Sequence, residues 1–296
     1  MNLVDAITIP HLDVGSWFAT IVNWLTGHLS GLWNFINVVL TTVNDNWLAR
    51  GLNAVPPLLM LVILAVLALL LRSWQFAVFT VIGMLIIQSM GFWKDSMDSL
   101  SLVIVAGVIA MIIAMPLGVL AARSGTASKI IKPIMDFMQT LPAFVYLIPA
   151  IFFFDIGTVP GIVATIVFAM PPGVRLTELG IRQVDQEMVE AGEAFGTAPT
   201  SVLTRIQIPL AMPTIMAGVN QVIMLSLSMV VIAGMVGAGG LGGVIYGAVT
   251  QLQIGPGFAG GLAVVILAIY LDRLTAALGD RSAVVQAAKK TAKAGR

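Results

Sequence analysis

The sequence contains no cysteine and only two histidines among its 296 residues. Without cysteine, the chain has no disulfide, no thiolate nucleophile and no cysteine metal ligand. His11 and His28 both lie near the N-terminus, and two histidines make a histidine-based catalytic or metal centre improbable. No Gly-Lys dipeptide occurs, so the chain cannot form a phosphate-binding loop of the Walker type. The sequence therefore predicts neither a catalytic site nor a metal or cofactor of its own.

Charge is also scarce. Charged residues make up only 10% of the chain, hydrophobic residues make up 58%, and the mean hydropathy is +1.00. Soluble domains carry about a quarter charged residues, whereas about 20 apolar residues cross a bilayer core. The composition therefore predicts an all-α, polytopic membrane protein. Seven candidate spans follow from the apolar runs, at about 53–71, 75–92, 99–122, 134–154, 157–174, 213–236 and 257–278.

The N-terminal region, residues 1–52, is amphipathic. Between 14 and 49, apolar residues follow helical spacing and Asn and Thr residues fall between them. Four of the six tryptophans lie here, and tryptophan favours the membrane–water interface. Two placements stay open: one or two helices lying in the interface, or an extra helix packed against the bundle.

A polar stretch between long apolar segments, from Glu190 to Pro209, carries the most information. Asp185 is a plausible N-cap for a short helix, and Gly196 can take the left-handed position that ends it. Pro199 is placed to begin a second turn. Helical spacing predicts an apolar ridge of Met188, Ala191, Gly192 and Phe195, with Glu187, Glu190 and Glu193 on another flank. Such a helix suits a groove on a partner protein.

The spacing in this stretch also carries a resemblance. Glu190-Ala191-Gly192, Gly196 and Ile206-x-Ile208-Pro209 resemble the EAA signature of the membrane subunits of ATP-binding-cassette importers, with Gly192 replacing an alanine and Ile208 a leucine. The resemblance implies a type I importer permease fold in which the loop 173–212 holds a cytoplasmic coupling helix. That helix docks on a separate ATPase subunit, which binds ATP and Mg²⁺. The residues implied to make or shape this contact are Glu190, Ala191, Gly192, Phe195, Gly196, Ile206, Ile208 and Pro209.

Positive charge is consistent with this topology. With the coupling loop in the cytoplasm, alternation of the spans leaves only Arg50 and Lys94 outside among the fifteen Lys and Arg residues. This agrees with the positive-inside rule and predicts an external N-terminus and a cytoplasmic C-terminus. The predicted organisation is an external amphipathic region 1–52, two accessory helices 53–92, a permease core 95–278 and a cytoplasmic tail 279–296.

A longer resemblance covers roughly residues 95–275. The runs DFMQTLPAFVYLIPAIFFFDIGTVPG from Asp136, FAMPPGVRLTELGIRQV from Phe168 and IQIPLAMPTIMAGVNQV from Ile206 are similar to permease subunits of glycine betaine, proline betaine or choline importers. The likeness implies a homodimer of permeases, two cytoplasmic ATPase subunits, an external binding protein and alternating access. It also implies a prokaryotic cytoplasmic (inner) membrane, with lipid around the chain and no nucleic acid partner.

Aromatic residues are the candidates for the substrate path, because quaternary ammonium groups are held by aromatic faces. The candidates are Phe144, Tyr146 and Phe152, with Gln139 as a polar neighbour; their alternative role is packing or lipid contact. Asp136 is either a cap at the membrane end or a group on the path. A permease for another small solute, such as an amino acid, is the main alternative function. An ion-coupled secondary transporter would show paired half-sequence symmetry and ionisable groups within the spans, and a membrane scaffold would need no coupling loop.

Overall fold

The computed structural model describes residues 12–280, and the predictions for residues 1–11 and for the tail from residue 281 lie outside this range. Every regular element in it is helical, which confirms the all-α prediction. The elements are α1 (Val14–His28), α2 (Ser30–Thr41), the π-helix η2 (Thr42–Ala49), α3 (Arg50–Ala54), α4 (Pro57–Leu71), α5 (Trp74–Ser89), α6 (Trp93–Arg123), α7 (Gly125–Thr140), α8 (Ala143–Phe154), α9 (Thr158–Arg182), α10 (Gln186–Ala194), α11 (Pro199–Val202), the π-helix η3 (Leu203–Gln207), α12 (Ile208–Met235), α13 (Gly240–Thr250) and α14 (Ile254–Asp280).

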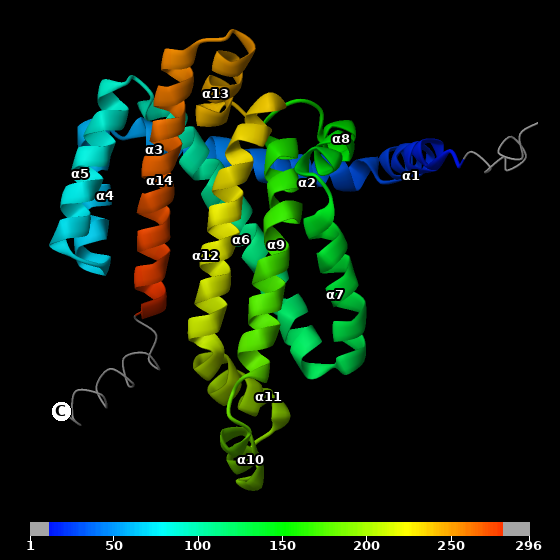
Figure 1. Ribbon diagram of the computed structural model, residues 1–296. Coiled ribbons are helices and arrows are strands. Elements are labelled where there is room, and N and C mark those ends of the chain that lie inside the picture. Colours follow the sequence, from blue (N-terminus) through cyan, green and yellow to red (C-terminus); the bar gives the residue numbers. More distant parts are fainter. Residues whose placement is uncertain (1–11, 281–296) are drawn as a thin grey trace, which may run out of the picture.

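Four long helices, α6, α9, α12 and α14, form the bundle in Figure 1. Each is long and apolar enough to cross a membrane, and α9 is the most buried of them. Small residues allow α9 to pack closely between α6 and α12. A Cβ atom added to Gly173 would lie 2.9 Å from Ala114 Cβ on α6 and 3.1 Å from Val222 Cγ2 on α12. Close backbone approach through small residues is how helices associate in lipid, where the surrounding chains are as apolar as leucine.

The predicted number of spans is too high. The structure has four single spanning helices in the described chain, or six spans if two bent helix pairs each count as one. α4 and α5 have only 15 and 16 residues, and α4 reaches spanning length only together with Ser30–Ala54, at an angle of 99°.

The predicted span 134–154 is also broken into α7 and α8, which meet at an angle of 96°. Leu141, the residue before Pro142, has an extended backbone with ψ of 134°. The proline ring disfavours helical geometry in the residue before it, so the chain turns at this point.

α4 and α5 form a hairpin joined by the short turn at Arg72-Ser73. The Ser73 hydroxyl accepts a hydrogen bond from the Phe76 amide at 3.3 Å and so caps α5. The hairpin lies beside α14 (Figure 1), where Phe76 stacks on Tyr270 with ring centroids 5.8 Å apart.

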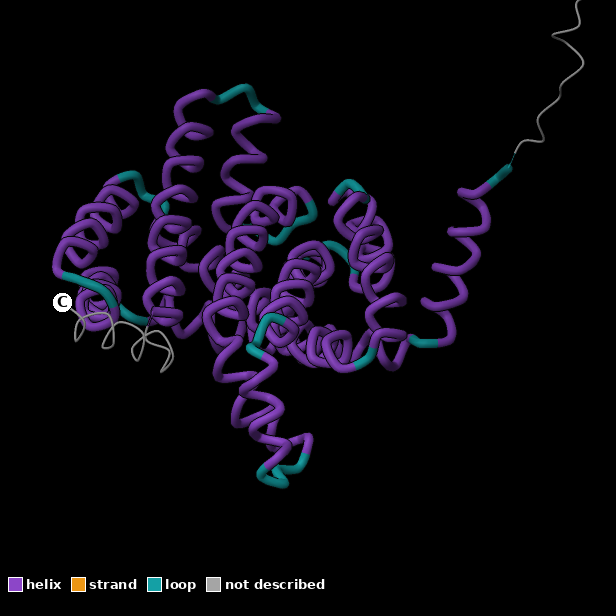
Figure 2. The backbone as a smooth tube through the Cα atoms, turned by 60° about the horizontal axis from the view of Figure 1, so that its bottom comes forward, coloured by secondary structure: helices purple, strands orange, loops and turns teal. Residues whose placement is uncertain are grey.

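The N-terminal helices run across the bundle near the end opposite α10, as Figure 1 shows. α2 packs against the bundle through Trp33, which stacks on Phe153 at 4.3 Å, and through buried Leu40. α1 instead points away from the bundle in both Figures 1 and 2, and Val22 is its only buried residue. α2 therefore packs against the bundle, whereas α1 presents apolar side chains outward.

A glycine-rich turn follows α12, and it leads directly into α13, a helix that the sequence analysis did not predict. Gly237, Gly239 and Gly240 have φ values of 85°, 70° and 59°, which only glycine adopts without strain. The turn folds α13 back against α12, and Gly234 on α12 touches the backbone of Gly242 on α13 so closely that neither position has room for a Cβ atom.

We expect Gly234→Ala to lower the free energy of unfolding by about 1–3 kcal/mol, because the added methyl group would force α13 away from α12. Thermal unfolding of the detergent-solubilised protein measures this. Gly243→Ala is the matched control, since a Cβ atom there meets no neighbour within 4 Å and alanine favours helix. Equal unfolding midpoints for the two variants would contradict the close packing.

Candidate functional site

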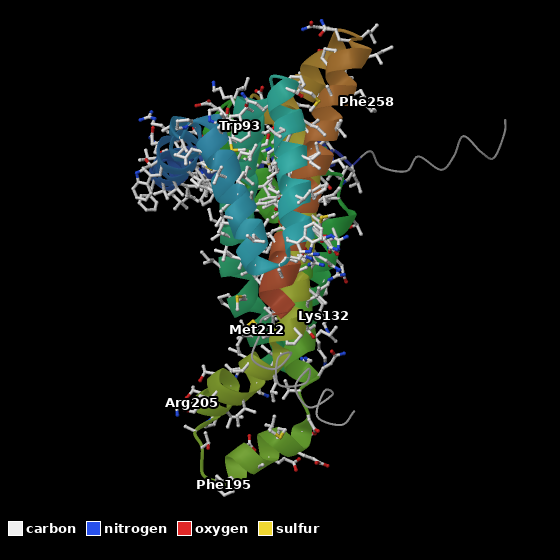
Figure 3. The ribbon with its side chains drawn as sticks, turned by 90° about the vertical axis from the view of Figure 1, so that its left-hand side faces the viewer. Trp93, Lys132, Phe195, Arg205, Met212 and Phe258 are labelled. Carbon is white, nitrogen blue, oxygen red and sulfur yellow. The ribbon has the colours of Figure 1, made fainter. Side chains whose placement is uncertain are left out.

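The polar stretch singled out in the sequence forms a protrusion at one end of the bundle. α10 lies beyond the ends of α9 and α12, the two helices that it connects through α11 and η3 (Figures 1 and 3). None of its residues is buried. Because α9 and α12 pack along their length, any displacement of α10 acts on two helices of the bundle together.

The ends of α10 are built as the sequence predicts. An Asp185 carboxylate oxygen accepts a hydrogen bond from the Glu187 amide at 3.0 Å. At the other end Gly196 has a φ of 74°. The amides of Gly196 and Thr197 donate to the carbonyls of Glu193 and Gly192, at 2.8 and 3.2 Å. These paired bonds form a Schellman motif, which gives α10 a sharp end. Pro199 begins α11, as expected.

The inner side of α10 faces the bundle. A Cβ atom on Gly192 would lie 2.7 Å from Ile206 Cδ1, so Gly192 packs on η3 and is not part of an exposed ridge as the sequence analysis expected. Glu193 is exposed, and it lines a cavity of about 330 Å³ together with Arg123 and Arg182. A Cβ atom at 192 would meet only the end of the Ile206 side chain at such a short distance, so an alanine there requires this side chain to shift.

The outer side of α10 presents a small apolar group with acidic neighbours. Phe195 is 90% exposed and Met188 is 50% exposed, and Ala191 lies between them. Glu187 and Glu190 are exposed beside this group. Phe195 stands at the tip of the protrusion in Figure 3. An aromatic side chain held outward on a rigid, capped helix suits insertion into a pocket on another protein.

The remaining predicted residues lie where the loop joins the bundle. Gly196 is exposed at the end of α10, whereas Ile206 and Ile208 are partly buried. Ile208 packs against a cluster that contains Ile181 and Leu203, and Pro209 follows it in the first turn of α12. The structure thus divides the predicted set into an outer group, Glu190, Ala191, Phe195 and Gly196, and an inner group, Gly192, Ile206, Ile208 and Pro209.

Sequence reasoning missed a buried carboxylate next to this loop. Glu178, near the end of α9, has only 3% of its surface exposed. Its Oε1 atom lies 2.9 Å from Arg182 Nε and 3.3 Å from Lys132 Nζ, and it accepts a hydrogen bond from Ser128 at 2.8 Å.

This cluster joins three helices of the bundle. Ser128 and Lys132 belong to α7, and the Arg182 guanidinium also donates to the Ala121 carbonyl of α6 at 2.8 Å. α6, α7 and α9 are therefore tied together one turn before α10 begins. The four-residue spacing of Glu178 and Arg182 was visible in the sequence, but their partners on α6 and α7 come from distant segments.

A second ion pair, between α7 and α9, involves Asp136. Its carboxylate pairs with Arg175 of α9. The two side chains are 61% and 41% exposed, so this pair lies at the surface of the chain.

Three of the four candidate path residues, Phe144, Tyr146 and Phe152, lie on α8, and Gln139 lies on α7. Gln139 is exposed near the end of α7, and the Tyr146 hydroxyl donates a hydrogen bond to the Met138 carbonyl. Phe144 and Phe152 are 50% and 60% exposed. In the described part of the chain, no ring of Phe144, Tyr146 or Phe152 stacks on another of the three. A single chain therefore contains no aromatic cage formed from these residues.

The structure is an apolar helical bundle with one capped, polar helix projecting from its end. This arrangement is typical of membrane-spanning subunits of larger transport assemblies. A family model described as the binding-protein-dependent transport system inner membrane component matches residues 114–284. The inward-facing MetNI methionine ABC transporter shares the fold, with a TM-score of 0.57 and 24% identity over 66% of this chain and 95% of that chain. The type I importer permease fold is thereby confirmed.

Curated relatives match almost the whole chain. It is 46% identical over 268 residues to the glycine betaine transport system permease protein OpuAB of Bacillus subtilis, covering 90% of this chain and 94% of that protein. It is 42% identical over 281 residues to the glycine betaine/proline betaine transport system permease protein ProW of Escherichia coli, covering 95% and 79%. The chain belongs to the family of inner membrane components of binding-protein-dependent transport systems.

We expect Glu178→Gln to lower the free energy of unfolding by about 1–3 kcal/mol, because it removes a buried, hydrogen-bonded negative charge that pairs with two cations. This loss of stability is smaller than that expected on breaking a fully buried ion pair, because the Lys132 and Arg182 side chains are 55% and 44% exposed. Asp136→Asn, which removes the exposed α7–α9 pair, is the matched control and should cost about 0–1 kcal/mol. Thermal unfolding in detergent compares the two, and an equal or larger effect of Asp136→Asn would refute the importance given to burial.

Proposed function

We propose that this chain is the membrane-spanning subunit of an ATP-driven importer of quaternary ammonium compatible solutes such as glycine betaine. The observation that carries the proposal is the similarity to glycine betaine permeases along nearly the full length of both chains. The protruding α10 supports it, since an importer of this kind needs a surface for its ATPase. An importer permease for another small solute is the second candidate. It is favoured only by the MetNI likeness, which at 24% identity concerns the fold alone.

The proposal includes a homodimer of this chain, two cytoplasmic ATPase subunits, an external binding protein and the cytoplasmic membrane of a prokaryote. It places α10 in the cytoplasm. The distribution of charge supports this orientation: Lys132 and Arg205 lie toward the α10 end in Figure 3, and Trp93, next to Lys94, lies at the opposite end. Arg72 also lies toward the α10 end, where it bonds to the Arg273 carbonyl at 3.4 Å.

The mechanism is mechanical, and this chain supplies no step of ATP chemistry. ATP and Mg²⁺ bind to the partner ATPase, whose closure displaces α10. The displacement tilts α9 and α12 together because they are packed along their length, and the cluster around Glu178 makes α6 and α7 follow. Alternating access results when the bundle of each copy changes its tilt relative to the other.

The direct test is reconstitution in liposomes with candidate ATPase and binding proteins. We expect ATP on the α10 side to drive uptake of labelled glycine betaine only when all three components are present. Uptake by this chain alone under an ion gradient would show a secondary transporter. Uptake of an amino acid in place of glycine betaine would leave the coupling intact and change the cargo.

Phe195→Ala should weaken association with the ATPase by about 2 kcal/mol, close to 30-fold, because an exposed aromatic anchor is the kind of residue that dominates an interface. Titration of the ATPase onto the permease in nanodiscs measures the affinity. Phe258→Ala is the matched control, since Phe258 is 75% exposed at the opposite end of the bundle (Figure 3). Unchanged affinity in Phe195→Ala, or an equal loss in both variants, would argue against docking on α10.

A further inference from the structure

A second polar site lies at the end of the bundle opposite α10. It is a cavity of about 380 Å³ between η2, α3 and the first turns of α6, closed by the start of α9 and by the glycine turn before α13. Two carboxylates, Asp45 and Asp98, and two cations, Arg50 and Lys94, line it. The sequence analysis assigned no role to any of these residues beyond placing Arg50 and Lys94 outside.

The charged side chains that line this cavity are not joined to one another in close ion pairs. Within residues 12–280, no ion pair joins any of the four side chains to another or to a different charged group. Their formal charges sum to zero, so the cavity does not favour an anion or a cation alone. Groups of both signs, left without charge partners in one cavity, match a ligand that itself carries both charges.

The two carboxylates are held in place by neutral amides. Asn44, which is only 2% exposed, donates to Asp45 Oδ1 at 2.6 Å, and its own Oδ1 accepts from Ser101 on α6 at 2.8 Å. Asn53 donates to Asp98 Oδ1 at 2.7 Å. These bonds orient Asp45 and Asp98 without cancelling their charge, and such support from neighbouring residues is typical of a binding site.

The cavity is open at the surface of the chain, because Arg50 and Lys94, which line it, are exposed. η2 crosses α6 at Ser101, and Lys94 and Asp98 lie on one side of the crossing. On the other side, Val43, Trp47 and Leu48 line an apolar cavity with Ile104 and Val108 of α6. A lipid would place its chains on that apolar side, separated by η2 from the charged cavity. The charged cavity therefore fits a dissolved molecule better than a lipid headgroup.

We propose that this cavity is an external binding site for a small zwitterion, in which Asp45 and Asp98 attract the cationic group and Arg50 and Lys94 attract the carboxylate. The choice of ligand rests on the proposed function, because glycine betaine is such a zwitterion. None of the residues that line the cavity is aromatic, so it holds a quaternary ammonium group less tightly than an aromatic cage does. Weak binding suits such a site, because the bound solute must be released from it before it enters the path through the membrane.

The natural absence of cysteine allows a direct test in the complete transporter. In a Thr158→Cys variant the only thiol of this chain lies in the wall of the cavity. We measure its alkylation by a membrane-impermeant maleimide in intact cells. Saturating glycine betaine should slow this labelling about threefold or more, as expected when most sites are occupied. Choline and acetate, which each carry one of the two charges, should not protect. Ser89→Cys, exposed at the end of α5 and outside the cavity, is the control and should label at the same rate with every solute.

Two further variants test the charges. Asp98→Asn and Lys94→Gln, each combined with Thr158→Cys, should abolish protection, measured in each variant as the ratio of the labelling rates without and with glycine betaine. Protection by choline equal to that by glycine betaine would overturn the zwitterion site. Failure of both Thr158→Cys and Ala49→Cys to label in intact cells would overturn an external, open cavity.

Uptake of glycine betaine, measured in the same cells, separates this inference from the proposed function. Normal uptake without protection would overturn the site and leave the function standing. Protection without uptake would overturn the function and support the site.

Discussion

The packing of α9 between α6 and α12 is the constraint on which the rest of the structure depends. It is possible only because glycines on α9 leave no side chain between the helices, as Gly173 shows against Ala114 and Val222. In a membrane there is no hydrophobic driving force between helices, so close van der Waals contact must hold them together. The loop that carries α10 connects α9 to α12 directly, and it is therefore attached to the most rigid part of the bundle.

Electrostatic contacts also join α7 to α6 and α9. A carboxylate buried near the membrane is costly unless it is paired and hydrogen-bonded, and Glu178 meets that requirement with partners from α7, α9 and, through Arg182, α6. The exposed pair of Asp136 and Arg175 joins two of the same helices but is screened by solvent. The buried cluster around Glu178, and not the exposed pair, is therefore the contact that links these helices more strongly.

The two ends of the bundle carry opposite kinds of polar surface. At the α10 end, a capped helix is followed by the exposed aromatic side chain of Phe195. At the other end, η2 and α6 enclose unpaired charges of both signs in a cavity. Between these ends the described helices are almost wholly apolar. Polar function is therefore confined to the two regions where water is available to solvate it, as expected for a protein whose middle lies in lipid.

Much of this architecture was determined by the sequence itself. Composition predicts a helical membrane protein, and Asp185, Gly196 and Pro199 predict the limits of α10, because caps and turns depend on residues that are near neighbours in the chain. The order of the apolar segments and the residue spacing of the loop that carries α10 can likewise be read from the sequence.

Only the tertiary structure decided what depends on distant contacts. It packed Gly192 against Ile206 and brought Ser128 and Lys132 to Glu178. It also placed Asp45 beside Asp98, two residues that lie far apart in the sequence. Spacing along the chain cannot predict such neighbours, because they are set by how whole helices pack and cross.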